Sequence, residues 1–328
     1  MIAFKKSSAI IVFLTAFFLT STSPQVFAQS KPIRLSIATG GTGGVYYPLG
    51  GGMAKLISKY APNIEATAEV TQGSQANCQL INSRKSDLAF IAADTASDAL
   101  RGQERFKSPG PMPLRTVAVV YSQYMHVVAS ADSGINSISG LKGKRVSIGA
   151  PGSGTEVISS RILESYGVNT EKDLKRERLG AAEAVGAFKD RKVAAFTWLG
   201  GLPTAAVLDL AATPGIRIKI LPSADNLDKV QQKYGPIYFR SLIPKSIYPG
   251  MNADVPVAAL SALLVCHEKM DSNLVYSVIK VLLEHQPELV EIHKEAKNFT
   301  LTNAIVGSSL PFHPGALKYF KEKGKTVN

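Results

Sequence analysis

Two glycine-rich turns carry the residue types best suited to chemistry in this chain. The first reads Gly40-Gly41-Thr42-Gly43-Gly44-Val45-Tyr46 and the second Pro151-Gly152-Ser153-Gly154-Thr155, and a helix pattern follows each. The start of a helix presents unpaired backbone N–H groups and the positive end of the macrodipole, which attract anions. Glycine lets a ligand approach the backbone closely because it has no Cβ. The two turns therefore predict a cleft that binds a small anion, with one turn on each side; a purely structural pair of turns is the alternative.

Strand and helix patterns alternate around the first turn. Alternating apolar residues predict strands at 33–38, 64–70 and 88–92, with helices at 47–60 and 75–84 between them. This β-α-β-α-β order implies parallel strands with helices on the faces of a sheet. In such sheets ligands bind beyond the carboxyl ends of the strands, where both glycine turns are expected.

The remainder of the chain repeats this order in a second lobe. After a loop at 101–113, predicted strands at 117–121 and 126–129 carry the chain across to this lobe. There we predict strands at 145–149, 193–198 and 216–221, and helices at 156–166, 183–189 and 203–212. The chain returns between residues 238 and 265, and helices at 273–285 and 316–323 pack on the first lobe. We therefore predict an α/β fold of two lobes, each a mostly parallel sheet flanked by helices. Lobe I comprises 29–122 and 266–328, and lobe II comprises 123–265.

The first 28 residues have the pattern of a cleaved signal peptide. Lys5 and Lys6 precede an apolar run at 9–20, and Val26-Phe27-Ala28 ends the segment with a small-residue cleavage site. The apolar run is shorter than the roughly 20 residues that a membrane-spanning helix needs. We expect cleavage after Ala28 and a periplasmic protein; an uncleaved anchor is the alternative.

Composition excludes several partners. The net charge is +12, but Lys and Arg are scattered and no nucleic-acid-binding motif accompanies them, so the charge favours solubility and attraction of anionic ligands.

Cys78 and Cys266 lie in apolar stretches without a metal or redox motif. Two separately buried thiols are favoured there, with a single disulfide as the alternative.

The sequence does not match the catalytic and cofactor-binding motifs that its glycine turns and histidines suggest. The first turn lacks the GxGxxG spacing and a following Gly-Lys-Ser/Thr, so no nucleotide cofactor is predicted. Ser153 stands one residue too close to the next glycine for a GxSxG nucleophile. The five histidines are isolated in sequence, which indicates neither a triad nor a zinc site. We predict no catalytic residue, no metal and no cofactor. An enzyme with the same fold remains an alternative hypothesis.

Five segments carry a family likeness, and they follow one another along the chain. They are ATGGTGGVYYPLGGGMA at 38–54, TQGSQAN at 71–77, LKGKRVSIGAPGSGT at 141–155, LGGLPTAAVLDLA at 199–211 and LPFHPGALKYF at 310–320. The chain resembles the TAXI-type solute receptors of tripartite ATP-independent periplasmic (TRAP) transporters. The resemblance implies a type II periplasmic binding fold that closes on a small organic acid, acts as a monomer and hands its ligand to membrane permease subunits driven by an ion gradient.

The better-understood members of this family bind glutamate or glutamine. Here Ala92 and Ala93 precede Asp94, where the family often has a glutamine and a small hydroxyl residue. A less polar carboxylate is therefore an alternative ligand. A receptor of similar fold that serves an ABC transporter or a sensor kinase is the alternative function.

Twelve residues are predicted to bind the ligand. We expect the N–H and hydroxyl groups of the second turn to bind its carboxylate, with the first turn on the opposite side. Ser74, Asn77 and Asp94 are expected to make polar contacts, and Asp94 would pair with an ammonium group if the ligand is an amino acid. Tyr121 and Trp198 are expected to enclose the carbon skeleton. The predicted residues are Gly43, Val45, Tyr46, Ser74, Asn77, Asp94, Tyr121, Ser153, Gly154, Thr155, Trp198 and Gly201. For Trp198 a role as a core aromatic is the alternative.

Overall fold

The computed structural model describes residues 1–3 and 31–327, and residues 32–328 form one compact unit. The predicted signal peptide and its cleavage site fall on residues 4–30, outside the described residues. Within the described part of the chain, no helix is long and apolar enough to cross a membrane.

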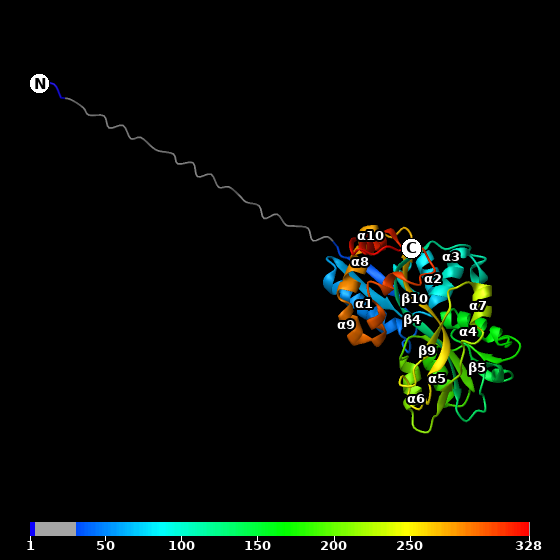
Figure 1. Cartoon of the computed structure of the whole chain (residues 1–328). Helices are drawn as coiled ribbons and strands as arrows, with labels where there is room; N and C mark the ends of the chain where they lie inside the picture. The colour runs from blue at the N-terminus through cyan, green and yellow to red at the C-terminus, as the bar shows by residue number, and fades with distance from the viewer. Residues whose placement is uncertain (4–30, 328) are drawn as a thin grey trace. The chain divides into compact units, whose positions relative to one another are not determined.

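One mixed sheet of ten strands organises this unit (Figure 1). Its main path runs β2-β1-β3-β10-β4-β7-β5-β6, while β8 pairs with β4 and β9 pairs with β10. The strands are β1 Ile33–Ala38, β2 Ile64–Glu69, β3 Leu88–Ala92, β4 Leu114–Ser130, β5 Arg145–Ser147, β6 Lys175–Glu177, β7 Ala195–Gly200, β8 Ile218–Ile220, β9 Phe239–Ile243 and β10 Val255–His267.

Two parallel triplets flank a central antiparallel pair. The triplet β2-β1-β3 lies on one side, which we call the β1 side, and β6-β5-β7 lies on the other, the β5 side. Strands β4 and β10 pair antiparallel between them and join the two sides into one sheet. Parallel pairing within each triplet follows from the alternation of strands and helices in the chain. The α/β class and the parallel triplets agree with the prediction, but a single mixed sheet replaces the two separate sheets that were expected.

The strand β4 is longer than the two predicted segments at 117–121 and 126–129. The polar residues Ser122 and Gln123 interrupt the apolar pattern. The backbone of β4 nevertheless stays paired with β10 at these positions, with Ser122 opposite Ser261 and Gln123 opposite Leu260. Backbone hydrogen bonds therefore keep the strand continuous where its side chains change character. The strand passes through the predicted lobe boundary at 122–123 without a break.

Helices cover both triplets. In Figure 1, α1, α8, α9 and α10 gather on the β1 side, and α4, α5 and α6 lie by β5 and β9. The helices are α1 Tyr46–Tyr60, α2 Ser74–Asn82, α3 Ala93–Arg101, α4 Gly154–Ser165, α5 Ala181–Lys189, α6 Ala205–Ala212, α7 Leu227–Tyr234, α8 Ser272–Glu284, α9 Gln286–Ile292 and α10 Pro314–Glu322.

Several short elements escaped the sequence analysis, and α3 is the most instructive. It starts directly after β3, with no loop between them, and its residues 93–99 are all buried although four of them are polar. Its apolar residues Ala93, Ala96 and Leu100 have helical spacing, but two of them are alanines, so the stripe is a weak signal for a helix. The elements β6, β9, α7 and α9 were missed as well, and each has nine residues or fewer.

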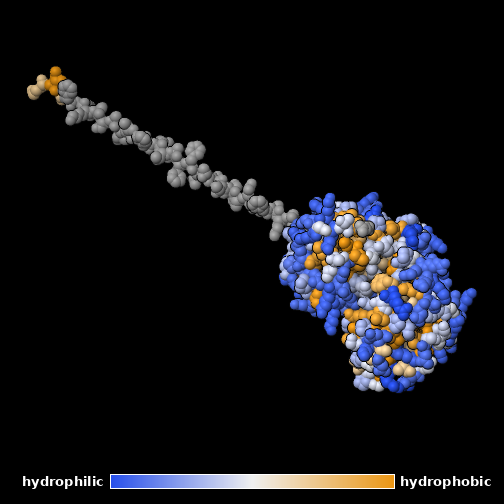
Figure 2. Space-filling model, in the orientation of Figure 1, coloured by the Kyte–Doolittle hydropathy of each residue, from blue (hydrophilic) through white to orange (hydrophobic). Residues whose placement is uncertain are grey.

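Two apolar clusters form the core. The larger extends from β1, β3 and β10 to α4 and β5, and the smaller joins β7, α5 and α6. Cys78 and Cys266 are buried and free, which confirms the favoured prediction for the cysteines. Burial raises the pKa of both thiols. The face in Figure 2 is mainly hydrophilic, with apolar residues in small patches, as expected for a protein in contact with water.

Candidate ligand-binding site

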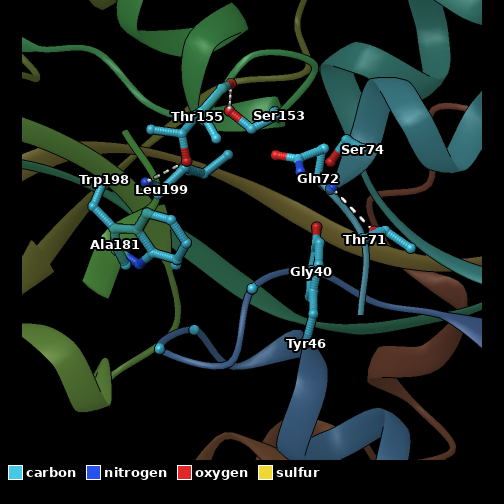
Figure 3. A pocket seen from close by; sticks show the side chains of 18 of the residues that line it. Gly40, Tyr46, Thr71, Gln72, Ser74, Ser153, Thr155, Ala181, Trp198 and Leu199 are labelled. Carbon is cyan, nitrogen blue, oxygen red and sulfur yellow. Dashed lines mark hydrogen bonds between the residues drawn. The ribbon is translucent and has the colours of Figure 1, made fainter. Parts of the chain in front are cut away.

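A cavity of about 350 Å³ lies where loops of the β1 side and the β5 side meet (Figure 3). Its walls are the turn between β1 and α1, the loop before α2, the middle of β4, the turn before α4, the loop before α5 and the end of β7. Both glycine turns therefore face the same cavity. Its volume is at the small end of the range for ligand sites.

Nine of the twelve predicted residues line this cavity. They are Gly43, Val45, Tyr46, Ser74, Tyr121, Ser153, Gly154, Thr155 and Trp198. They come from five separate segments of the chain, which the crossing strands and the helix packing bring together.

Asn77 does not line the cavity. It is fully buried, and its Nδ2 donates hydrogen bonds to the carbonyl oxygens of Thr39 (2.7 Å) and Phe90 (2.8 Å). Its Oδ1 accepts from the Thr71 hydroxyl at 2.7 Å. Asn77 therefore ties the end of β1 and the middle of β3 to the loop before α2, and it supports the site without lining it.

Asp94 lies away from the cavity too, which removes it as the expected partner of a ligand ammonium. It is fully buried in α3 and accepts hydrogen bonds from the Thr95 N–H and from the Tyr238 hydroxyl, the latter at 3.1 Å. The Arg161 guanidinium of α4 lies 3.8 Å from its Oδ2. Burial raises the pKa of Asp94, with Arg161 opposing that shift. An internal ion pair therefore occupies this carboxylate.

Gly201 is the third predicted residue outside the cavity lining. A Cβ at this position would lie 2.7 Å from Cγ of Glu295 and 2.9 Å from the Tyr121 ring, so Gly201 allows the backbone to pack against these side chains. Ala92 and Ala93 are fully buried and stand outside the lining as well.

The second glycine turn begins α4. Ser153 is the N-cap residue, and its Oγ accepts from the Glu156 N–H at 3.1 Å and donates to the Ala150 carbonyl at 2.7 Å. The proton of the Ser153 hydroxyl is thus used within the turn, so this hydroxyl does not donate to a ligand carboxylate as predicted. Gly154 and Thr155 are the first two residues of α4, where backbone N–H groups have no acceptor within the helix. The Thr155 hydroxyl accepts from Leu199 N–H at 3.2 Å and keeps its proton available.

A second helix start, which the sequence analysis did not assign to the site, faces the cavity as well. Gly180, Ala181, Ala182 and Glu183 line it at the beginning of α5. The N-cap Gly180 has no side chain to satisfy the first N–H groups. These groups and the helix dipole favour a negative charge in the cavity.

Arg178 supplies a formal positive charge that sequence reasoning also missed. It follows β6, lines the cavity, and has its Nε buried without a hydrogen-bond partner among the described residues. Its Nη2 lies 2.7 Å from Oε1 of Glu156, and Arg105 reaches the same oxygen at 3.7 Å. The buried Glu156 carboxylate thus faces two guanidinium groups, of which that of Arg178 lines the cavity. The charge-rich run at 171–178 was the available signal, but solvated loops have the same pattern.

Trp198 closes the cavity from the end of β7. Its ring packs against the first turn, where a Cβ on Gly44 would lie 2.8 Å from Cζ2. Its Nε1 donates to the Thr204 hydroxyl at 3.1 Å. In Figure 3 the indole lies beside Ala181, opposite the loop that carries Thr71 and Ser74. Trp198 is half-buried, so it serves as an apolar wall as well as a packing residue.

Among the described residues, no group of three or more His, Cys, Asp or Glu side chains could hold a metal ion. The charged residues that line the cavity are Arg178 and Glu183. The arrangement of N–H donors and a guanidinium suits reversible binding of an anion.

Comparison with protein families decides the classification, because the match extends over residues 37–324 and so includes both glycine turns and the whole cavity. The chain belongs to the NMT1-like family. This family comprises periplasmic solute-binding domains related to ABC substrate-binding proteins, and it is a family of binding proteins, not of enzymes.

Solved structures show the same fold for this NMT1-like protein. A protein of Bordetella bronchiseptica RB50 has 14% identity and a TM-score of 0.53, with 89% of each chain covered. A putative L-cystine ABC transporter protein from Listeria monocytogenes has 12% identity and a TM-score of 0.50, covering 82% of this chain and 98% of that one. The structural neighbours are type II periplasmic binding proteins, as the family resemblance implied.

Proposed function

We propose that this protein is the periplasmic receptor of a TAXI-type TRAP transporter, which captures a small organic acid and delivers it to the membrane permease. Two lobes with the predicted boundaries at 122–123 and 265–266 close over the ligand. Support comes from the family membership and from the five segments that resemble TAXI receptors. The observation that carries the binding step is Arg178, which lines the same cavity as two helix N-termini and whose buried Nε has no hydrogen-bond partner among the described residues.

The ligand carboxylate binds to donors of the β5 side. Gly154 and Thr155 contribute N–H groups at the start of α4, Ala181 contributes one at the start of α5, and the Arg178 guanidinium adds charge. Hydrogen bonds from a charged donor are about twice as strong as those between neutral groups. Trp198 and Tyr121 pack on the carbon skeleton, and closure excludes water, which strengthens the polar contacts.

Arg178→Gln tests the binding step, with Arg105→Gln as the matched control. Both arginines face Oε1 of Glu156, but Arg178 lines the cavity and Arg105 does not. Native mass spectrometry of protein purified without refolding identifies a retained acid, and calorimetry then measures its affinity. We expect Arg178→Gln to weaken binding at least about tenfold, or about 1.4 kcal/mol, and Arg105→Gln to leave it within about twofold. Equal affinities for the two variants would refute this site.

An ABC transporter is the second candidate partner. The relation of the NMT1-like family to ABC substrate-binding proteins favours it. Reconstitution of the receptor with its permease in vesicles separates the two. Uptake driven by an ion gradient without ATP supports the TRAP assignment, whereas uptake that requires ATP supports the ABC alternative.

A further inference from the structure

A strongly basic surface lies at the amino-terminal ends of the strands β5, β6 and β7. Seven cationic side chains of the described residues line a hollow of about 910 Å³ there, together with one carboxylate, that of Asp132. All seven cations are exposed. Lys and Arg are scattered along the sequence, and the fold gathers these seven on one surface. We call them the basic patch, which consists of Lys144, Arg145, Lys175, Lys189, Arg191, Lys192 and Arg217.

Parallel pairing within the triplet brings the basic patch together. Arg145 of β5 lies directly opposite Lys175 of β6, and the Lys175 N–H donates to the Lys144 carbonyl oxygen at 2.9 Å. The ligand cavity is lined by residues that follow β5 and β6 and by the end of β7. Because parallel strands have their amino ends at one edge of a sheet and their carboxyl ends at the other, the patch and the cavity lie at opposite ends of the same three strands. The patch is therefore separate from the cavity.

Part of the positive charge of the basic patch is not balanced by the protein. Four of its cations pair with carboxylates. Lys144, Lys175 and Arg191 make no ion pair in the part of the chain that the structure describes. Like charges gathered on one surface repel one another, and this repulsion disfavours the folded state. An anionic partner outside the protein would relieve it.

Arg191 adds a second observation. It follows α5 with a φ of 57°, in the left-handed region that glycine adopts at lower cost. Its N–H donates to the Phe188 carbonyl oxygen at 3.0 Å, so the backbone of this turn is held in place. The chain thus presents an exposed guanidinium without an ion pair in the described structure, at a position where the backbone favours a residue without a side chain.

The composition of the basic patch favours a lipid surface over a protein partner. None of the exposed large hydrophobic side chains of the described residues lies in the patch, and Phe188 and Val193, which line the hollow, are buried. The centre of a protein–protein interface is apolar, and Lys is depleted there. Anionic phospholipid headgroups attract exposed Lys and Arg without any apolar anchor.

We propose that the basic patch binds the surface of a membrane that contains anionic phospholipid. The contact uses the edge of the triplet opposite the cavity, so the cavity stays clear of the headgroups. This inference goes beyond the proposed function, and it holds for either class of transporter because the patch takes no part in binding the acid.

Vesicle flotation tests the proposal. The protein, purified after export, is mixed with vesicles of phosphatidylglycerol and phosphatidylcholine in equal parts, or of phosphatidylcholine alone. We expect at least about tenfold stronger binding to the anionic vesicles, because each cation near an anionic surface contributes about fivefold to the affinity. This binding should disappear between about 50 mM and about 500 mM salt, since salt screens exposed charges. Equal binding to both kinds of vesicle, or binding to neither, would overturn the proposal and leave the proposed function intact.

A triple variant locates the contact. It combines Lys144→Gln, Lys175→Gln and Arg191→Gln, the three cations without an ion pair among the described residues, and it should weaken binding to anionic vesicles at least about tenfold. Urea denaturation should show a stability at least equal to that of the wild type, because the substitutions remove repulsion between like charges. Should the triple variant fail to fold, Lys175→Gln decides alone, with an expected weakening of about fivefold.

The matched control removes the same charge from the β1 side. It combines Lys55→Gln of α1, Lys280→Gln of α8 and Lys321→Gln of α10, which are exposed and make no ion pair within the described residues. We expect vesicle binding of this control within about twofold of the wild type. Equal weakening in both triple variants would show that net charge alone acts, and it would overturn the role of the patch. Binding to the isolated permease that depends on the patch, without vesicle binding, would assign the patch to a protein partner instead.

Discussion

The carbonyl oxygen of Gly152 accepts a hydrogen bond from the backbone N–H of Gln75 at 3.0 Å. The second glycine turn therefore caps the helix α2, which lies on the β1 side. The Gln75 side chain donates a second hydrogen bond in the same direction, from Nε2 to the Ser153 carbonyl at 3.0 Å. The two sides of the sheet thus meet through backbone groups beside the cavity. Contacts of this kind hold the cavity closed, and they leave the first N–H groups of α4 for a ligand.

Gly154→Ala is expected to disturb this contact. A Cβ at residue 154 would lie 2.7 Å from the Ser74 Oγ and 3.1 Å from the Ala92 Cβ, so the second turn and α2 must separate. We expect acid binding to weaken at least about tenfold in calorimetry because closure becomes less favourable. Gly186→Ala in α5 is the control, since a Cβ there meets open space. Wild-type affinity in Gly154→Ala would show that the close approach of the turns does not matter for binding.

Arg161→Met is expected to destabilise the protein. Arg161 of α4 contacts Asp94 and Asp98 of α3, and its Nη1 donates to the Tyr238 hydroxyl at 2.8 Å. Removal of the guanidinium leaves two buried carboxyl groups without a cation, which costs about 3–5 kcal/mol. Urea denaturation measures the loss. A loss below about 1 kcal/mol, the value of an exposed ion pair, would contradict this role.

Tyr238→Phe provides the graded control for Arg161→Met. It removes one hydroxyl that donates to Asp94 at 3.1 Å and leaves the guanidinium in place. The expected loss is about 1–3 kcal/mol, because Asp94 and Arg161 each lose a hydrogen bond but remain paired. The same denaturation series should therefore rank Tyr238→Phe between the wild type and Arg161→Met.

His126 is expected to make the stability depend on pH. The ring is fully buried, with Nε2 2.9 Å from the Tyr248 hydroxyl and Nδ1 2.8 Å from the Tyr124 carbonyl oxygen. Burial lowers the pKa of His126 from 6.5 to about 4. Between these values the unfolded chain binds the additional proton, so the free energy of unfolding falls as the pH drops from 6.5 to 4, by about 3 kcal/mol.

His126→Gln isolates this effect when it is compared with the wild type at each pH. The comparison is needed because burial raises the pKa of Asp98 to about 6. That carboxyl group acts in the opposite direction, since its contribution to stability falls as the pH rises from about 4 to 6. Urea denaturation of both proteins from pH 4 to 7 should show a steeper acid loss for the wild type; parallel curves would contradict the assignment to His126.

The sequence predicted the elements with strong periodicity. The strands at 33–38 and 88–92 have the predicted bounds, and the helix predicted at 47–60 begins one residue earlier. Their apolar spacing reports directly which face is buried. The helix α3 escaped because its buried polar residues find partners in distant parts of the chain, and no local pattern encodes such partners.

For the site, the sequence supplied the two turns, and nine of its twelve proposed residues line one cavity. Arg178 and Gln123 were missed because a polar residue in a loop or in an apolar strand has many ordinary explanations. Asp94 was predicted to pair with the ligand but pairs with Arg161 instead. The chemistry of a carboxylate does not reveal which cation packs against it.

The sequence by itself determined the class of fold, the two helix starts rich in glycine and the absence of a catalytic motif, because these depend on local spacing and residue type. Only the tertiary structure decided that Arg161 pairs with Asp94, that Arg178 lines the cavity, and that Tyr46 and Gln123 line the same cavity. The physical reason is that a hydrogen bond or an ion pair forms between groups that long-range packing brings within about 3–4 Å of each other, and sequence order does not specify that packing.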